Sequence, residues 1–276
     1  MATAATSFIP VKSLTFAGMK IPFYKYHGAG NDFILMDNRD GAIQLTVEQV
    51  AALCHRRFGI GADGLMLLQA TAGADFEMVY YNSDGNESTM CGNGGRCIAA
   101  FAYHKGIAGE HMSFKAIDGL HEAHILGNGT VALHMQAVKQ IDFEERYTIL
   151  DTGSPHLVQW VEDLDQTEVF REGRDIRNWT RFQPKGINVN FVQRLDKGIA
   201  IRTYERGVED ETMACGTGVT AAAIVAAGKE TGHFDIPVQA MGGDLSVAFD
   251  KKDAGTAEHI VLTGGATFVF EGTVTI

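Results

Sequence analysis

The apolar residues after Thr46 recur at the spacing of one helical face. This spacing holds to Cys54, and it predicts an amphipathic helix within residues 46–58. Gln49 stands three residues after Thr46, so the two side chains can form a capping box at the first turn. Thr46 is therefore the expected helix start.

Other segments alternate apolar with polar residues or are rich in aromatic and β-branched types, which predicts strands. Residues 121–135 form two alternating runs around Gly-Asn-Gly, typical of a hairpin. The further expected strands are 77–81, 198–204 and 266–276. Helix-forming runs cover 97–105 and 219–229, and each begins directly after a Cys-Gly-x-Gly sequence. The chain is therefore expected to be mixed α/β.

The sequence repeats itself at a shift of 124 positions. Residues 76–94 then lie over 200–218 without a gap, which matches Tyr80 to Tyr204 and Cys91 to Cys215. Shifts of 123 and 125 align further short segments in the same order. Several matches at nearly one shift predict two halves that share one fold.

Length and charge exclude some classes of protein. A chain of 276 residues suits one large domain or two small ones. The net charge is −11 and the sequence has no Lys/Arg cluster, which argues against nucleic-acid binding. No apolar stretch approaches the roughly 20 residues that span a bilayer. Residues 1–19 lack a secretory pattern, so we expect a mobile leader, a cytoplasmic protein and four cysteines that remain free thiols.

The two repeated cysteines each precede a predicted helix. A helix N-terminus favours negative charge, so we expect both thiols to have a lowered pKa. The backbone amides of 92–94 and 216–218 can then hold a carboxylate. Two thiols facing one carbon could remove a proton from one side and deliver a proton to the other, which inverts the configuration. Cys54 and Cys97 have no counterpart in the repeat and are expected in the core.

Other interpretations of these residues remain open. The repeated cysteines could be structural, could serve a thiol–disulfide redox protein, or could belong to a non-catalytic binder of small molecules. A redox protein would more often carry Cys-x-x-Cys, which is absent here. The sequence Gly-Ile-Gly-Ala-Asp-Gly (59–64) fits the dinucleotide fingerprint, but it follows a predicted helix and precedes an apolar run, so we reject that reading.

Five segments together resemble the diaminopimelate epimerase family: "YHGAGNDFILMDN", "MCGNGGRC", "GSPH", "INVNF" and "YERG…ETMACGTG". The resemblance implies an α/β (α+β) fold with two pseudo-symmetric halves, each a mixed, largely antiparallel β-barrel around a central helix. The active site would lie in the cleft between them. The halves would span 20–140 and 141–265, and the final strand, 266–276, can pack on the first half. It also implies interconversion of LL- and meso-diaminopimelate without pyridoxal phosphate or metal, by a homodimer.

The resemblance also implies the roles of individual residues. Cys91 and Cys215 would be the acid and base, with His156 and Glu205 as polar residues beside them. The residues implied in substrate binding are Asn31, Asn82, Gly92, Asn93, Ser154, Asn188, Glu205, Arg206, Gly216 and Thr217. Arg206 can pair with the far carboxylate of the substrate, and Glu205 and Asn82 can accept from its far ammonium group.

The chain departs from the family pattern at four places. Ser154 stands where many members have Asn, and Gly64 where some have Gln. The loop before Cys215 is one residue longer than usual, although it is as long as its counterpart in the first half. Phe270 replaces a Tyr often found at the dimer contact. Proline or hydroxyproline racemase uses the same pair of thiols and is the nearest rival.

Overall fold

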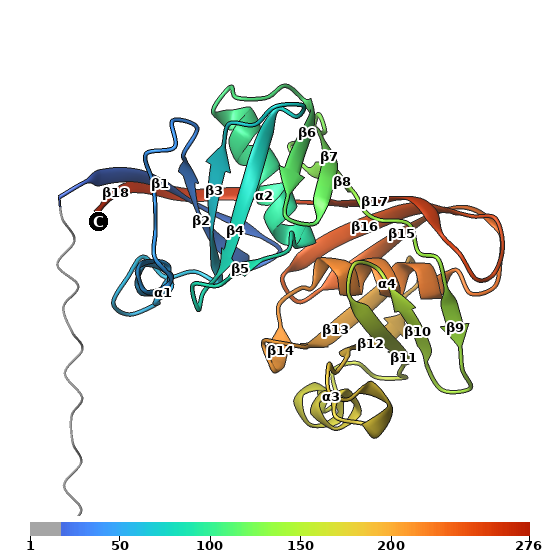
Figure 1. The fold of residues 1–276 in the computed structure, drawn as a ribbon. Coiled ribbons are helices and arrows are strands. Elements are labelled where there is room, and N and C mark those ends of the chain that lie inside the picture. The colour runs from blue at the N-terminus through green and yellow to red at the C-terminus, as the bar shows by residue number, and fades with distance from the viewer. Residues whose placement is uncertain (1–17) are drawn as a thin grey trace, which may run out of the picture.

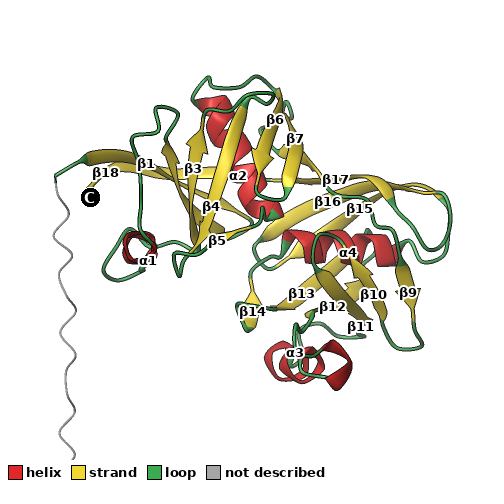
Figure 2. Cartoon of the chain, in the orientation of Figure 1, coloured by secondary structure: helices red, strands yellow, loops and turns green. Residues whose placement is uncertain are grey.

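The computed structural model describes residues 18–276, so the predicted leader lies almost entirely outside it. The chain forms two lobes side by side, and each lobe wraps strands around one long helix (Figures 1 and 2). The elements of the first half are β1 (Lys20–Gly28), β2 (Asn31–Asp37), α1 (Val47–Cys54), β3 (Gly64–Gln69), β4 (Phe76–Asn82), β5 (Glu87–Ser88), α2 (Gly92–His104), β6 (His111–Ala116), β7 (Gly119–Ile125) and β8 (Val131–His134).

The second half repeats this order with an extra strand, β9, at its start and a short 3₁₀ helix after α3, and one further strand follows it. Its elements are β9 (Ile141–Phe143), β10 (Thr148–Asp151), β11 (Pro155–Trp160), α3 (Val169–Arg177), a short 3₁₀ helix (Thr180–Phe182), β12 (Asn188–Arg194), β13 (Ile199–Glu205), β14 (Asp210–Thr212), α4 (Gly216–Ala226), β15 (Gly232–Ala240), β16 (Gly243–Lys251) and β17 (Glu258–Gly264), followed by β18 (Thr267–Thr275).

The strand pairing shows the duplication directly. The first half runs β18-β1-β2-β3-β4-β6-β7-β8, and the second β9-β10-β11-β12-β13-β15-β16-β17. Parallel pairs occur at the same two places in each series, β2–β3 and β4–β6 against β11–β12 and β13–β15. Helices provide the crossovers that parallel pairs need. The predicted mixed α/β fold of two related halves is therefore confirmed.

The halves are joined by hydrogen bonds as well as by the chain. β8 pairs with β17 in an antiparallel ladder, so the sheet of the first half continues into that of the second. β18 pairs along its length with β1, which places the last strand of the chain beside the first (Figure 1). The division into 20–140 and 141–265 stays a prediction.

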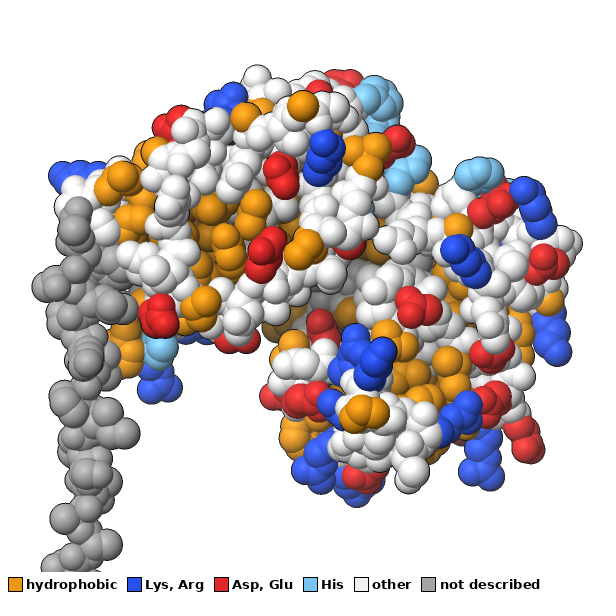
Figure 3. Space-filling view, viewed as in Figure 1, with side chains coloured by type: hydrophobic (Ala, Val, Ile, Leu, Met, Phe, Trp, Pro, Cys, Tyr) orange, Lys and Arg blue, Asp and Glu red, His pale blue; other side chains and the backbone are white. Residues whose placement is uncertain are grey.

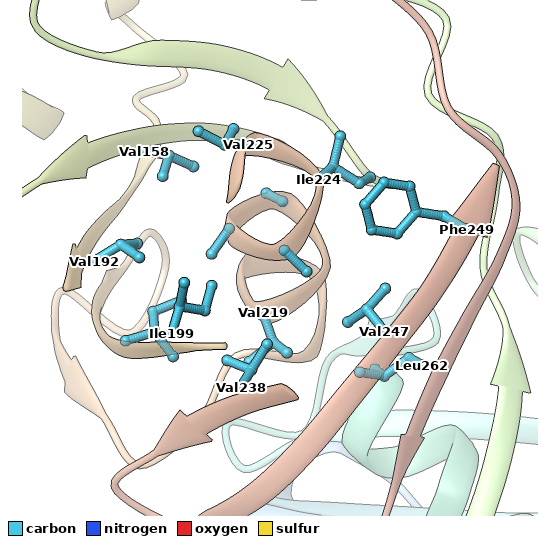
Figure 4. Close-up of a cluster of buried hydrophobic side chains, with 14 of the residues drawn as sticks. Val158, Val192, Ile199, Val219, Ile224, Val225, Val238, Val247, Phe249 and Leu262 are labelled. Carbon is cyan, nitrogen blue, oxygen red and sulfur yellow. The ribbon is translucent and has the colours of Figure 1, made fainter. Parts of the chain in front are cut away.

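The two central helices are buried by the strands around them. α4 carries apolar residues on every face, as expected of a helix enclosed by a sheet. Val219, Ile224 and Val225 pack there against β-strand residues such as Val247 and Phe249 (Figure 4). α2 has the same position in the first half, with Ile98 and Phe101 fully buried.

The local predictions are confirmed with one shift. Thr46 caps α1 through the predicted capping box with Gln49, and Cys54 and Cys97 are buried in the core. The hairpin forms from β7 and β8. α2 and α4, however, begin at the first glycine after each repeated cysteine. The helices therefore start earlier than the expected runs at 97 and 219, and Cys91 and Cys215 are the N-cap residues.

We predict that Ile224→Ala lowers the free energy of unfolding by about 2–5 kcal/mol, because the fully buried side chain would leave a cavity. Urea denaturation followed by circular dichroism measures this change. The matched control is Ile117→Ala, since Ile117 is 64% exposed and its loss leaves no cavity. Equal effects of the two substitutions would contradict the enclosed position of α4.

Candidate active site

The N-termini of α2 and α4 meet head to head between the lobes. A β-carbon built on Gly216 would lie 3.0 Å from the Cα atom of Gly92, and one built on Gly92 would lie 3.4 Å from the Cα atom of Gly216. A side chain at either position would therefore hold the helices apart. The molecular surface is hollowed between the two lobes (Figure 3).

This arrangement brings the two repeated cysteines into one site. Cys91 is half-buried, and its sulfur accepts a hydrogen bond of 3.2 Å from the amide of Gly94. Cys215 is 8% exposed, and its sulfur lies 3.4 Å from the hydroxyl oxygen of Thr217. The two sulfurs are close enough that the charge of Cys91 contributes to the raised pKa of Cys215.

The expected lowering of both thiol pKa values is wrong. Burial raises the pKa of Cys91 to about 11 and the pKa of Cys215 to about 12. The carboxylate of Glu205 adds to both increases, while the Gly94 amide opposes the increase at Cys91 and Thr217 opposes it at Cys215. Desolvation of a thiolate between two packed lobes outweighs the favourable helix terminus. Both groups are thiols at neutral pH.

Backbone amides remain free beside the sulfurs. The first amides of a helix have no intrahelical acceptor. The amide of Gly94 donates to the Cys91 sulfur and the amide of Asn93 also acts on it, but within residues 18–276 no hydrogen bond uses the amides of Gly92, Gly216 or Thr217. These three donors come from both halves, so they can bind one carboxylate at the junction of the helices.

His156 lies beside the Cys215 half of the site as a neutral ring. It is fully buried, and its Nε2 atom is 3.0 Å from the hydroxyls of both Ser154 and Thr217. Burial and the charge of Arg206 lower the pKa of His156 to about 3. His156 does not contact the Cys215 sulfur directly. It reaches that sulfur through the hydroxyl of Thr217.

Glu205 and Arg206 stand at the end of β13. Burial raises the pKa of Glu205, whose carboxylate accepts a hydrogen bond of 2.9 Å from the Thr212 hydroxyl. Within residues 18–276 the guanidinium of Arg206 has no carboxylate within 4.0 Å. A surface salt bridge therefore does not account for Arg206, and its charge is available to a ligand.

The four asparagines differ in how firmly they are held. Asn188 donates to Ser154 and to the Pro155 carbonyl and accepts from the Arg206 amide at 2.9 Å, so it is held firmly in this segment, and its substrate contact stays a prediction. Asn93 donates to the Ala214 carbonyl at 2.8 Å and, more weakly, to Asn31. Asn82 is exposed at the end of β4, which leaves its amide available.

The departures from the family pattern have local explanations. The Ser154 hydroxyl joins His156, Thr217 and Asn188 in one hydrogen-bonded group. A β-carbon on Gly64 would lie 2.5 Å from the Tyr80 ring, so this position has no room for a side chain.

The loop before Cys215 matches its counterpart in length but not in strand register. Tyr204 faces Glu211, whereas Tyr80 faces Ser88, which is one position further along the repeat. Glu209 in that loop takes a φ of 59° and pairs with Arg177 at 2.9 Å. The longer loop is therefore anchored to α3.

Two residues of the site escaped the sequence analysis. Asn190 is fully buried and donates to His156 Nδ1 at 3.1 Å and to the Leu157 carbonyl. Because His156 Nδ1 accepts this bond, its proton lies on Nε2, toward Thr217 and Ser154. Asp63 accepts from Asn31 at 2.7 Å and so orients it. Asn190 alternates with Asn188 along β12, a pattern that could have indicated it.

Comparison with known proteins identifies the family. The sequence profile described as diaminopimelate epimerase matches residues 23–141 and 148–269. The chain belongs to the diaminopimelate epimerase family. The diaminopimelate epimerase of Flavobacterium psychrophilum is 49% identical over 258 residues, which cover 91% of this chain and 99% of the relative. That of Chlorobaculum tepidum is 45% identical over 262 residues, 90% of this chain and 99% of the relative. The chain is thus an isomerase of the epimerase type.

Solved structures of other proteins share the fold of this chain at much lower sequence identity. A PhzF-family phenazine biosynthesis protein from Bacillus anthracis has a TM-score of 0.74 at 16% identity and covers 94% of this chain and 100% of its own. A hydroxyproline epimerase from Agrobacterium vitis has a TM-score of 0.66 at 15% identity, with 93% of each chain covered. These likenesses concern the fold alone.

Residues 18–276 contain neither a membrane-crossing helix nor a group of metal-ligating side chains. None of the helices there has the length and apolar character needed to cross a membrane. In the same part of the chain, no three His, Cys, Asp or Glu side chains are grouped so that they could hold a metal ion.

We predict that Asn190→Asp moves the His156 proton from Nε2 to Nδ1, because a carboxylate accepts where the amide donated. Epimerase turnover should fall by at least about tenfold, as when a tautomer-fixing residue is changed in a catalytic triad. The ¹⁵N chemical shifts of His156 report the tautomer. Asn128→Asp, in an exposed turn, is the matched control. Unchanged shifts with lost turnover would contradict this account of Asn190.

Proposed function

We propose that the chain interconverts LL- and meso-2,6-diaminopimelate, the reaction of its family, with Cys91 and Cys215 as the two acid–base groups. The observation that carries this proposal is the head-to-head meeting of two helix N-termini. Each presents one cysteine and free amides at the same place, at the close approach of Gly92 and Gly216. Two sulfurs from opposite halves can flank one carbon of a bound amino acid.

The proposed reaction balances as a proton exchange. One sulfur, as a thiolate, takes the proton from the α-carbon, and the electron pair of the broken C–H bond spreads onto the carboxylate as an enediolate. The other sulfur gives its S–H proton to the opposite face of that carbon. The free amides of Gly92, Gly216 and Thr217 stabilise the enediolate charge. Each turnover leaves the thiolate on the opposite sulfur, and the reverse reaction restores it.

The ammonium groups of the substrate provide the positive charge that the thiols lack. A thiolate with a pKa near 11 or 12 forms only when a cation lies close by or a proton is transferred on binding. The Glu205 carboxylate, whose charge reaches both sulfurs, can accept from an ammonium group. Asn31 and Asn82 add amide groups at the edge of the first half, and the unpaired guanidinium of Arg206 can bind the far carboxylate.

The exchange of α-hydrogen with solvent tests the proposal. In D₂O, LL-diaminopimelate should give meso product that carries deuterium at the inverted carbon, while unreacted substrate keeps protium, because two different sulfurs handle the two protons. Cys91→Ala and Cys215→Ala should each lower turnover by about 10²–10⁴-fold, the usual contribution of a general acid or base. Mass spectrometry and NMR measure both quantities.

Control substitutions and a rival substrate complete this test. Cys54→Ala removes a thiol from α1, in the core of the first half, and should leave turnover unchanged. Substantial turnover by either Cys91→Ala or Cys215→Ala would contradict the two-thiol scheme. Exchange with proline but not with diaminopimelate would favour a proline racemase instead.

We also propose that the chain is a homodimer through β18. Among the described strands β18 pairs only with β1, and its consecutive residues Phe268, Val269 and Phe270 are 43–51% exposed. An exposed apolar edge strand favours association.

Sedimentation should give twice the 29.9 kDa mass of one chain, and Phe270→Asp should reduce the measured mass to that of one chain. Leu120→Asp, at another exposed apolar site, is the control. A monomeric unmodified protein would overturn this proposal.

A cytoplasmic location stays our expectation. All four cysteines are free thiols in the structure. Free thiols at this spacing suit a reducing compartment, where disulfides are rare.

A further inference from the structure

α2 carries an arginine that is buried without a counter-ion. Arg96 is 0% exposed, and its guanidinium donates to the Gly92 carbonyl at 3.1 Å and to the Asn93 side-chain oxygen at 2.9 Å. Its Nε atom has no partner, and no carboxylate of residues 18–276 lies within 4.0 Å of it. A buried charge without a paired opposite charge is strongly unfavourable, so its presence calls for a reason.

The backbone of both halves closes around this guanidinium. A β-carbon on Gly28, at the end of β1, would lie 3.3 Å from one terminal nitrogen, and a β-carbon on Gly264, at the end of β17, would lie 3.2 Å from Nε. The titratable groups whose charge acts on Arg96 are the thiols of Cys97 and Cys91. The positive charge is thus enclosed at the junction of the halves, with the reactive sulfur as a near neighbour.

The duplication provides an internal comparison. The shift of 124 that matches Cys91 to Cys215 places Arg96 on Thr220. Thr220 is also fully buried, and its hydroxyl donates to the Gly216 carbonyl at 2.9 Å. That carbonyl corresponds to the Gly92 carbonyl that Arg96 contacts. A neutral hydroxyl therefore satisfies this contact in the second half, and the hydrogen bond does not explain why the first half has a charge.

The second contact of Arg96 leads to the site. By donating to the Asn93 side-chain oxygen, Arg96 fixes the direction in which the Asn93 amide nitrogen points. That nitrogen donates across the junction to the carbonyl of Ala214, the residue before Cys215. Arg96 thereby holds together the two segments that carry the reactive sulfurs.

We propose that Arg96 is a positioning residue that acts through Asn93 and offsets, by its charge, the negative charge which the reaction develops at the two helix N-termini. This inference rests on the proposed function for its substrate. The guanidinium touches neither sulfur, so it acts through its field and through Asn93. Arg96 is fully buried, and a fixed charge acts more strongly from a buried, low-dielectric position than from water. The charge is retained for reactivity, since Thr220 makes the equivalent hydrogen bond in the second half without a charge.

Arg96→Thr tests this directly, because it reproduces the arrangement found at Thr220. The new hydroxyl can donate to the Gly92 carbonyl, so the variant should fold with an unfolding temperature equal to or above that of the unmodified protein. Its kcat should fall by about 10²-fold with a smaller change in KM, as when one stabilising group for a developing anion is removed. Arg96→Lys keeps the charge and should recover part of this loss.

A second readout needs no substrate. The rate at which iodoacetamide alkylates Cys91 follows its thiolate fraction, and the charged groups acting on Cys91 are Arg96, which favours the thiolate, and Glu205, which opposes it. Arg96→Thr should therefore move the alkylation profile of Cys91 to higher pH, and Arg96→Lys should move it less. Cys215, read in the same digest by mass spectrometry, is the internal reference, since Arg96 is not among the main groups that shift its pKa.

The outcomes of these experiments distinguish a role of Arg96 in reactivity from a structural role. Thr220→Val removes the equivalent hydrogen bond without a charge and should leave both kcat and Cys91 alkylation nearly unchanged. An Arg96→Thr variant that fails to fold, or that keeps normal kcat and alkylation, would overturn the proposal in favour of a structural role. If the unmodified protein does not exchange diaminopimelate, the proposed function fails while the alkylation shift still decides the role of Arg96.

Discussion

The close approach of two helix N-termini is the constraint on which the rest of this structure depends. Gly92 and Gly216 let two backbones come nearer than any side chain would allow. That approach places a cysteine from each half in one site and aims unpaired amides from both halves at the same point. The sheets that surround α2 and α4 hold the helices in this position, and the ladder between β8 and β17 keeps the halves in register.

The chemistry of the site follows from burial as much as from the helix dipoles. Desolvation keeps both thiols protonated, which at first looks unfavourable for a base. A thiolate whose conjugate acid has a pKa near 11 or 12 is, however, a much stronger base than one near 8, and the α-hydrogen of an amino acid is a very weak acid. The buried site thus holds less thiolate at neutral pH, but the thiolate that forms there is a stronger base. His156 is neutral for the same reason, so it offers hydrogen bonds without adding charge.

Much of this could be predicted from the sequence, and the limits have physical causes. The shift that relates Cys91 to Cys215 is a property of the sequence, and the paired crossovers of the two halves follow from it. The capping box at Thr46 is local and was therefore visible. The raised thiol pKa values were not, because they depend on how closely the lobes pack, which no local pattern records.

Asn190 and Arg96 show the same limit in another form. Asn190 contacts His156, which folding brings near from another strand. Arg96 contacts Asn93, which lies one helical turn away. Asn190 lies two positions from Asn188 on one strand, which was a usable signal. Arg96 stands inside the cysteine motif itself, yet only its complete burial distinguishes it from an ordinary solvated arginine.

The pairing of β18 with β1 has a consequence for the order in which the protein can be made. A ribosome releases the strands of the first half early, but the ladder at β1 stays incomplete until residues 267–275 emerge. During that interval the edge of β1 is open, and apolar side chains such as Ile21 and Phe23 lack their final cover. The newly made first half therefore lacks its last strand until the whole second half has been translated.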